Sequence, residues 1–189
     1  MSKQSKRMKI VRQRIKDKEF DEDEEGRAIV TINITDADTL LSTYNDDGKE
    51  IISEETATFI NNVTKPIPPR QDIHLMIACD SYTSSKEEVY KNAIINYYQH
   101  EFAHRENKLR NNSIISMMLL FLGIVFFTAL YFVGRWNDEH VFYLLLEVVS
   151  WVFAWEAVDQ LVLQRNMIRF MQKKELQIIF AKITFKKLK

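Results

Sequence analysis

Residues 114–133, IISMMLLFLGIVFFTALYFV, restrict the fold of this chain more than any other stretch. They include no charged residue, and Ser116 and Thr128 carry their only aliphatic hydroxyl groups. A helix of about 20 residues rises far enough to cross a bilayer hydrocarbon core of about 30 Å. We therefore expect a first transmembrane helix over residues 113–134.

A second apolar stretch follows a short connection. Residues 141–163, VFYLLLEVVSWVFAWEAVDQLVL, are long enough to span a bilayer, although they include Glu147, Glu156 and Asp159. Residues 135–140 leave room only for a tight external reversal, so we expect an antiparallel hairpin. Because acids inside a membrane are rare and costly, a buried core helix is the alternative for this second stretch.

Small residues recur on one side of the second stretch, in line with Glu147: Ser150, Ala154 and Ala157. Small side chains let helices approach closely in lipid. This side is the expected contact face for the first helix or for a second copy of the chain.

The polar residues inside the hairpin can be paired by depth. Counted inward from the loop, Glu147 reaches a depth similar to that of Thr128, and Asp159 a depth similar to that of Ser116. We expect these pairs to satisfy one another. For Glu156 and Asp159, a place at the cytosolic interface and a role in a proton or ion path are both open.

Charge at the ends of the two stretches predicts their orientation. Basic residues precede the first stretch and follow the second: Arg105, Lys108, Arg110, Arg165, Arg169, Lys173 and Lys174. The connection has one basic residue, Arg135, beside two acids. The positive-inside rule then places both termini in the cytoplasm, in a multi-pass protein of the cell inner membrane.

Overall composition excludes two classes of protein. Lys and Arg total 26, and so do Asp and Glu, so no net charge attracts nucleic acid. The single Cys79 cannot form an internal disulfide framework, which fits a reducing compartment.

The part outside the hairpin predicts a small α/β domain over residues 28–112. AIVTINI and DIHLMIAC have the composition of strands, and SEETATFINNV between them that of a helix, so a right-handed crossover would make the strands parallel. Residues 164–189 add a cytosolic helix and then KITFKK, which alternates like an edge strand. The expected fold class is α+β: a two-helix transmembrane hairpin with a small cytosolic α/β domain, built from the N-terminal half and the C-terminal tail.

Residues 1–27 form a charged tail. KQSKRMKIVRQRIKDK carries eight basic residues and one acid, and five acids follow in FDEDEEG. Such blocks are usually disordered. Because Met8, Val11 and Ile15 would share one side of a helix, a basic amphipathic segment on anionic lipid is the alternative.

His100, Glu101 and His104 form the motif HEFAH, which matches the H-E-x-x-H pattern of zinc peptidases. Their helical side also carries apolar residues, which favours structural partners and no cofactor. In the alternative, His100, His104 and Glu175 bind zinc and Glu101 is the catalytic base. Glu175 is the only downstream acid that a helical rise brings to the depth of His104.

Two resemblances to known families bear on these expectations. YQHEFAHRENKLRNNSIISMMLLF resembles membrane zinc peptidases of the HtpX type over about twenty-five residues. Nearly all of residues 29–185 resembles an uncharacterised family of bacterial two-span membrane proteins with a W-V-x-x-W stretch in the second span. Trp151, Val152 and Trp155 match that stretch, while Glu156 and Ala157 replace its usual basic residue and proline. This second resemblance implies the two-span architecture and no activity.

These features favour a non-enzymatic inner-membrane protein that presents a small cytosolic interaction or sensing domain. Its expected partners are the bilayer, further copies in a homo-oligomer and an unknown cytosolic protein or ligand. A membrane-tethered zinc metallopeptidase using HEFAH is one alternative. A small ion- or proton-conducting effector that uses Glu147, Glu156 and Asp159 is the other.

Overall fold

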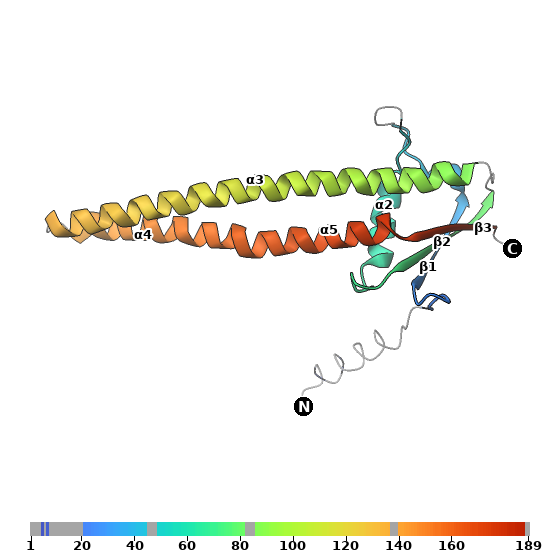
Figure 1. Cartoon of the computed structure of the whole chain (residues 1–189), viewed down its shortest axis with the longest axis horizontal. Coiled ribbons are helices and arrows are strands. Elements are labelled where there is room, and N and C mark those ends of the chain that lie inside the picture. The colour runs from blue at the N-terminus through green and yellow to red at the C-terminus, as the bar shows by residue number, and fades with distance from the viewer. Residues whose placement is uncertain are drawn as a thin grey trace. The chain divides into compact units, whose positions relative to one another are not determined.

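The computed structural model describes Ser5, Arg7 and residues 21–44, 49–81, 86–136 and 140–187 (Figure 1). It does not describe the side chains of Ser81, residues 133–136 or residues 140–142. Most of the predicted N-terminal tail and half of the predicted external loop therefore lie outside the described residues. The chain divides into two compact units, residues 1–98 with 177–189, and residues 99–176.

A three-stranded parallel sheet organises the first unit. Strands β1 (Ala28–Asp36), β2 (Ile73–Ser81) and β3 (Lys182–Lys187) lie in the order β1-β2-β3. The predicted parallel pair and the third strand at an edge are confirmed. The central strand β2 is the most apolar, because a strand with neighbours on both sides has little contact with water.

Helices cover one face of this sheet. The helices are α2 (Glu54–Thr64), the first residues of α3 (Glu87–Trp136) and the last residues of α5 (Arg165–Ile179). Their side chains form one core with the strands: Val30, Ile32, Ile60, Leu75, Ile77, Ala93, Ile94, Tyr98, Ile178 and Ile183. The Tyr98 hydroxyl also contacts α2, where it donates to the Ala57 carbonyl at 3.3 Å. The mixed helix-and-sheet class is thus confirmed.

The second unit is helical. It contains the rest of α3, then α4 (His140–Val158), a π-helical turn η3 (Asp159–Gln164) and the start of α5. α3 packs on α4 where Phe126 stacks on Phe153 at 5.4 Å and where a Cβ on Gly123 would lie 3.6 Å from the Ala154 nitrogen. The predicted contact face of small residues is buried here, since Ser150 and Ala157 have no exposed surface.

One helix among the described residues is long and apolar enough to cross a membrane. It runs over Glu87–Phe132 in α3, and only 11% of its most apolar window is buried. The first predicted span lies in this helix. The second span and the orientation stay predictions.

Ser53 starts helix α2, and its loss should weaken that helix. Its hydroxyl accepts a hydrogen bond from the Thr56 amide at 3.2 Å as the N-cap. We expect Ser53→Ala to lower the free energy of unfolding by about 0.5–2 kcal/mol. We also expect it to speed hydrogen exchange of the α2 amides. Ser53→Asp keeps an accepting oxygen and is the control; equal loss in both variants would contradict the capping role.

Candidate functional site

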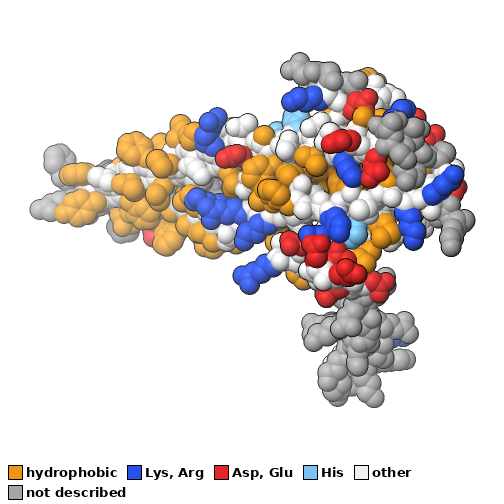
Figure 2. Space-filling model, turned by 45° about the vertical axis from the view of Figure 1, so that its right-hand side comes forward, with side chains coloured by type: hydrophobic (Ala, Val, Ile, Leu, Met, Phe, Trp, Pro, Cys, Tyr) orange, Lys and Arg blue, Asp and Glu red, His pale blue; other side chains and the backbone are white. Residues whose placement is uncertain are grey.

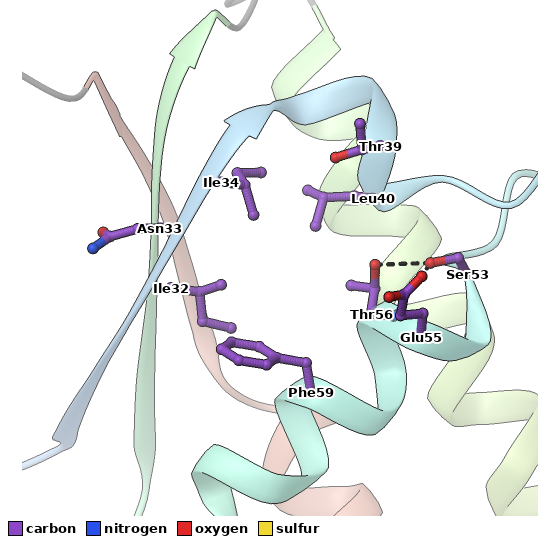
Figure 3. A pocket seen from close by; sticks show the side chains of 9 residues that line it. All are labelled: Ile32, Asn33, Ile34, Thr39, Leu40, Ser53, Glu55, Thr56 and Phe59. Atoms are coloured by element: carbon purple, nitrogen blue, oxygen red, sulfur yellow. Dashed lines mark hydrogen bonds between the residues drawn. The ribbon is translucent and has the colours of Figure 1, made fainter.

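A pocket opens in the first unit beside strand β1 (Figure 3). Its volume is about 390 Å³, at the low end of ligand sites, which range from about 300 to 1,000 Å³. Ile32, Ile34, Leu40 and Phe59 converge on it from β1, the 3-10 helix η1 (Ala37–Leu40) and α2. Apolar walls of this kind accept an apolar group.

The rim of the pocket is polar and acidic. Ser53 and Thr56 lie there, with their hydroxyl oxygens 2.8 Å apart, beside the exposed Glu55. An apolar ligand with a cationic group would therefore meet both an apolar wall and a carboxylate. Sequence reasoning missed this pocket because its walls come from three elements and no motif marks it.

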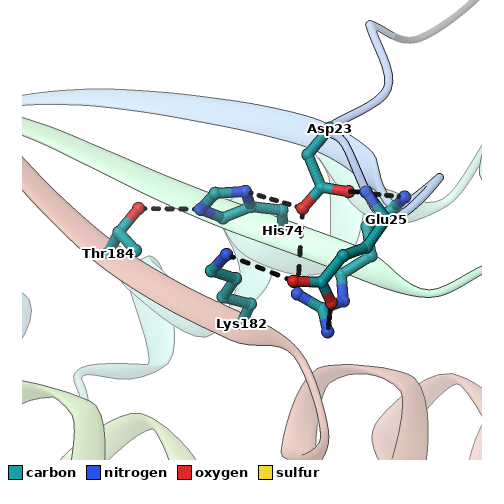
Figure 4. A network of polar contacts seen from close by, with 6 residues as sticks. Asp23, Glu25, His74, Lys182 and Thr184 are labelled. Atoms are coloured by element: carbon teal, nitrogen blue, oxygen red, sulfur yellow. Dashed lines mark hydrogen bonds and ion pairs between the residues drawn. The ribbon is translucent and has the colours of Figure 1, made fainter.

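A second cluster centres on His74 of β2 (Figure 4). The His74 Nε2 atom lies 2.9 Å from the Thr184 hydroxyl of β3. On the other side, Nδ1 lies 3.2 Å from Oδ2 of Asp23. The Thr184 hydroxyl, the His74 imidazole and the Asp23 carboxylate follow one another in the same order as the groups of a hydrolase triad. None of these three residues lines the pocket beside β1.

Asp23 gives the cluster a structural role. It accepts hydrogen bonds from the amides of Arg27 at 2.9 Å and Glu25 at 3.0 Å. The Arg27 amide bond is the main cause that lowers the pKa of Asp23, and it outweighs desolvation. The cluster thus holds the segment before β1 against β2 and β3.

HEFAH lies on α3 with His100 and His104 exposed, and Arg105 follows it directly. Arg105 forms an ion pair with Glu175 of α5 and lies 3.6 Å from Glu101. Glu175 is 5% exposed, and burial raises its pKa while Arg105 opposes the rise. Glu175, considered above as a zinc ligand, therefore has a cation beside it. Among the described residues, no group of three His, Cys, Asp or Glu side chains is placed to hold a metal ion.

A polar cluster lies within the predicted hairpin. Gln160, in the π-helical turn, is its centre. Its Nε2 donates to Glu156 at 3.0 Å, and its Oε1 lies 3.4 Å from the Ser116 hydroxyl. Asn112 donates to the Gln160 carbonyl at 3.1 Å. Helix α3 and the π-helical turn after α4 are thus joined by amides at this level.

For three residues of the predicted pairs, the structure gives other hydrogen-bond partners, while the pairing of Glu147 stays a prediction. Asp159 accepts from Gln164 at 3.2 Å, while Ser116 meets Gln160, one position further along the chain. Thr128 donates to the Ile124 carbonyl of its own helix at 2.8 Å. The depth count brings both Asp159 and its neighbour Gln160 to the level of Ser116, and the amide of Gln160 is the group that lies near the Ser116 hydroxyl.

Comparison of the chain with known protein families, curated proteins and solved structures finds no match. The two family resemblances stay hypotheses.

Removing the cation beside Glu175 should destabilise the helical unit. We expect Arg105→Ala to lower the free energy of unfolding at neutral pH by about 1–3 kcal/mol, because a buried carboxylate loses its charged partner. The loss should shrink as pH falls through the raised pKa of Glu175, since the protonated acid needs no cation. Thermal unfolding in detergent measures this.

Two controls make the Arg105 test specific. Lys108→Ala removes an exposed basic residue from the same helix and should change little. The double variant Arg105→Ala, Glu175→Gln should recover part of the loss. Equal effects of Arg105→Ala and Lys108→Ala at every pH would contradict the pairing.

Asp23 should stabilise the fold only when ionised. Its pKa is lowered in the folded state, so its contribution is present above its usual value of 3.8 and is lost as pH falls through the lower folded value. We expect Asp23→Asn to be less stable than the wild type at pH 7, with a difference that vanishes at strongly acidic pH. Melting temperatures across this range, beside the exposed Glu24→Gln, test the prediction. A difference independent of pH would contradict it.

Proposed function

We propose that this protein is a non-enzymatic integral protein of a bacterial inner membrane. Its two apolar helical segments form a transmembrane hairpin, and its α/β unit is a cytosolic interaction module. One observation carries the proposal: the apolar side chains of α3 and α4 are exposed in the isolated chain. Phe121 is 66% exposed and Trp155 is 71% exposed, and many neighbours resemble them.

Exposed apolar surface of this extent requires an apolar surrounding. Burial of apolar surface is favourable by about 25 cal/mol per Å², so contact of side chains such as Met117 and Phe121 with water is unfavourable in free energy. Figure 2 shows apolar side chains gathered over the α3 and α4 part, while charged side chains gather elsewhere. A lipid bilayer supplies the surrounding that these helices lack.

The polar side chains of the helices also support insertion. The acids Glu156 and Asp159 accept hydrogen bonds from the nearby amides of Gln160 and Gln164. Partners on the same helix reduce the cost of carrying acids toward lipid and favour a structural role over ion conduction. We expect both termini in the cytoplasm, because the basic residues flank the hairpin on that side.

Extraction and thiol labelling test the proposal. The protein should remain in membranes washed with alkaline carbonate. On intact cells, a membrane-impermeant maleimide should label Asn137→Cys, in the predicted external loop, and should label Lys187→Cys only after lysis. Wild type is the control, because its single Cys79 is buried. Release by carbonate, or labelling of Lys187→Cys on intact cells, would contradict the proposal.

A further inference from the structure

Strand β1 has a free edge. The Ala28 amide donates to the Asp72 carbonyl on the β2 side at 2.9 Å, and the Ile29 amide donates to Asp21 on the opposite side at 2.7 Å. Because this direction alternates along a parallel strand, the backbone groups of Thr31 and Asn33 also point away from β2. In the described part of the chain, these groups have no backbone partner.

The chain already uses the start of this edge. Glu22 makes an antiparallel bridge with Ala28, so an extended segment can pair with β1 from outside the sheet. Beyond Ile29 the edge continues along the pocket of Figure 3. Ile32 and Ile34 point into that pocket, while Asn33 points to the other face of the sheet.

An added strand would send alternate side chains into the pocket. Phe59 is 50% exposed there, and about 390 Å³ of space adjoins it. A side chain opposite Ile32 would enter this space. The neighbours two positions away on the same face would reach its rim.

Charge determines which residues fit at the rim. Glu54 and Glu55 are exposed in the first turn of α2, and Glu22 and Asp36 are exposed near the two ends of the edge. A strand with Lys or Arg on either side of its apolar residue matches these acids. Like charges at the same positions would repel.

A second copy of the chain fits less well than a basic peptide. Antiparallel pairing of two β1 strands would bring Asp36 of one copy toward Glu22 of the other. The lysines of β3 match the acids of β1 in charge, but Ile183 is buried in the core of its own copy and cannot fill the pocket. Pairing of β3 with β1 of another copy would also be head-to-tail, so the assembly would remain open at both ends.

We propose that the β1 edge and its pocket bind an extended segment of a partner protein. The segment carries an apolar side chain flanked on the same face by Lys or Arg. Backbone groups of Thr31 and Asn33 pair with the segment, its apolar side chain enters the pocket beside Phe59, and Glu55 holds a flanking cation. The inference rests on the proposed role as an interaction module and names the chemistry of the partner.

The probe is a fluorescent peptide, Ser-Lys-Thr-Phe-Thr-Lys-Ser, measured by anisotropy with the full chain in detergent. Its alternating Lys, Phe and Lys share one face in either direction of pairing. We expect saturable binding that Glu55→Gln weakens about tenfold and that salt also weakens. The peptide with Glu in place of Lys is the matched control and should bind much less. Equal binding of the two peptides would overturn the proposal.

Backbone pairing needs its own test. Asn33→Pro removes an outward amide that takes no part in the pairing with β2, whereas Asn33→Ala keeps that amide. We expect loss of binding by several-fold in the first variant and not in the second. A probe N-methylated at alternate residues should not bind the wild-type chain, which gives the same information if Asn33→Pro does not fold. Binding by the methylated probe would overturn strand addition. Extraction and labelling of the wild type do not depend on these variants, so failure of the membrane proposal would be seen separately.

Discussion

The pairing of β3 with β2 is the contact on which the fold of the whole chain depends. β3 comes after residues 99–176, so it can join β2 only when the chain returns from the helical unit. Closing so long a segment costs conformational entropy that burial of side chains such as Ile183 must offset. Gln177 fixes the point of return, since its buried amide donates to the carbonyls of Pro68 and Gln71 just before β2.

The helical unit depends on a second constraint, the supply of hydrogen-bond partners for polar groups that lie among apolar side chains. A π-helical turn changes the hydrogen bonding of a helix, and here Asn112 of α3 donates to the carbonyl of Gln160 within that turn. Under the proposed membrane insertion such a bond would have few competitors, so it would fix the register of α3 on the π-helical turn. Close contacts of small residues, such as Gly123 against Ala154, then permit the approach that this bond requires.

The strands and helices could be predicted from the sequence because the signals for them are local. The β-branched stretch AIVTINI predicted β1, SEETATFINNV predicted α2, and the uncharged stretch from Ile114 predicted the apolar helix. The sites could not be found in the same way. The pocket joins Ile32 to Phe59, and the His74 cluster joins Asp23 to Thr184 across long separations. Asn112 and Gln160 differ from these sites, because amides beside or within apolar helical stretches are a signal that the sequence itself contains.

The two edges of the sheet carry charges of opposite sign, and each edge is expected to repel the same edge of a second copy. Edge strands invite association, and charged side chains on them discourage it. β3 carries exposed Lys182, Lys186 and Lys187, while acids border β1. Repulsion between like charges therefore opposes the pairing of β3 with β3, and of β1 with β1, between two copies. Pairing of unlike edges is opposed because Ile183 and Phe185 are already packed in the core, so β3 cannot offer an apolar side chain to the pocket. The acids that would oppose pairing of β1 with itself are then the same groups that, in the proposed interaction, would select a basic partner.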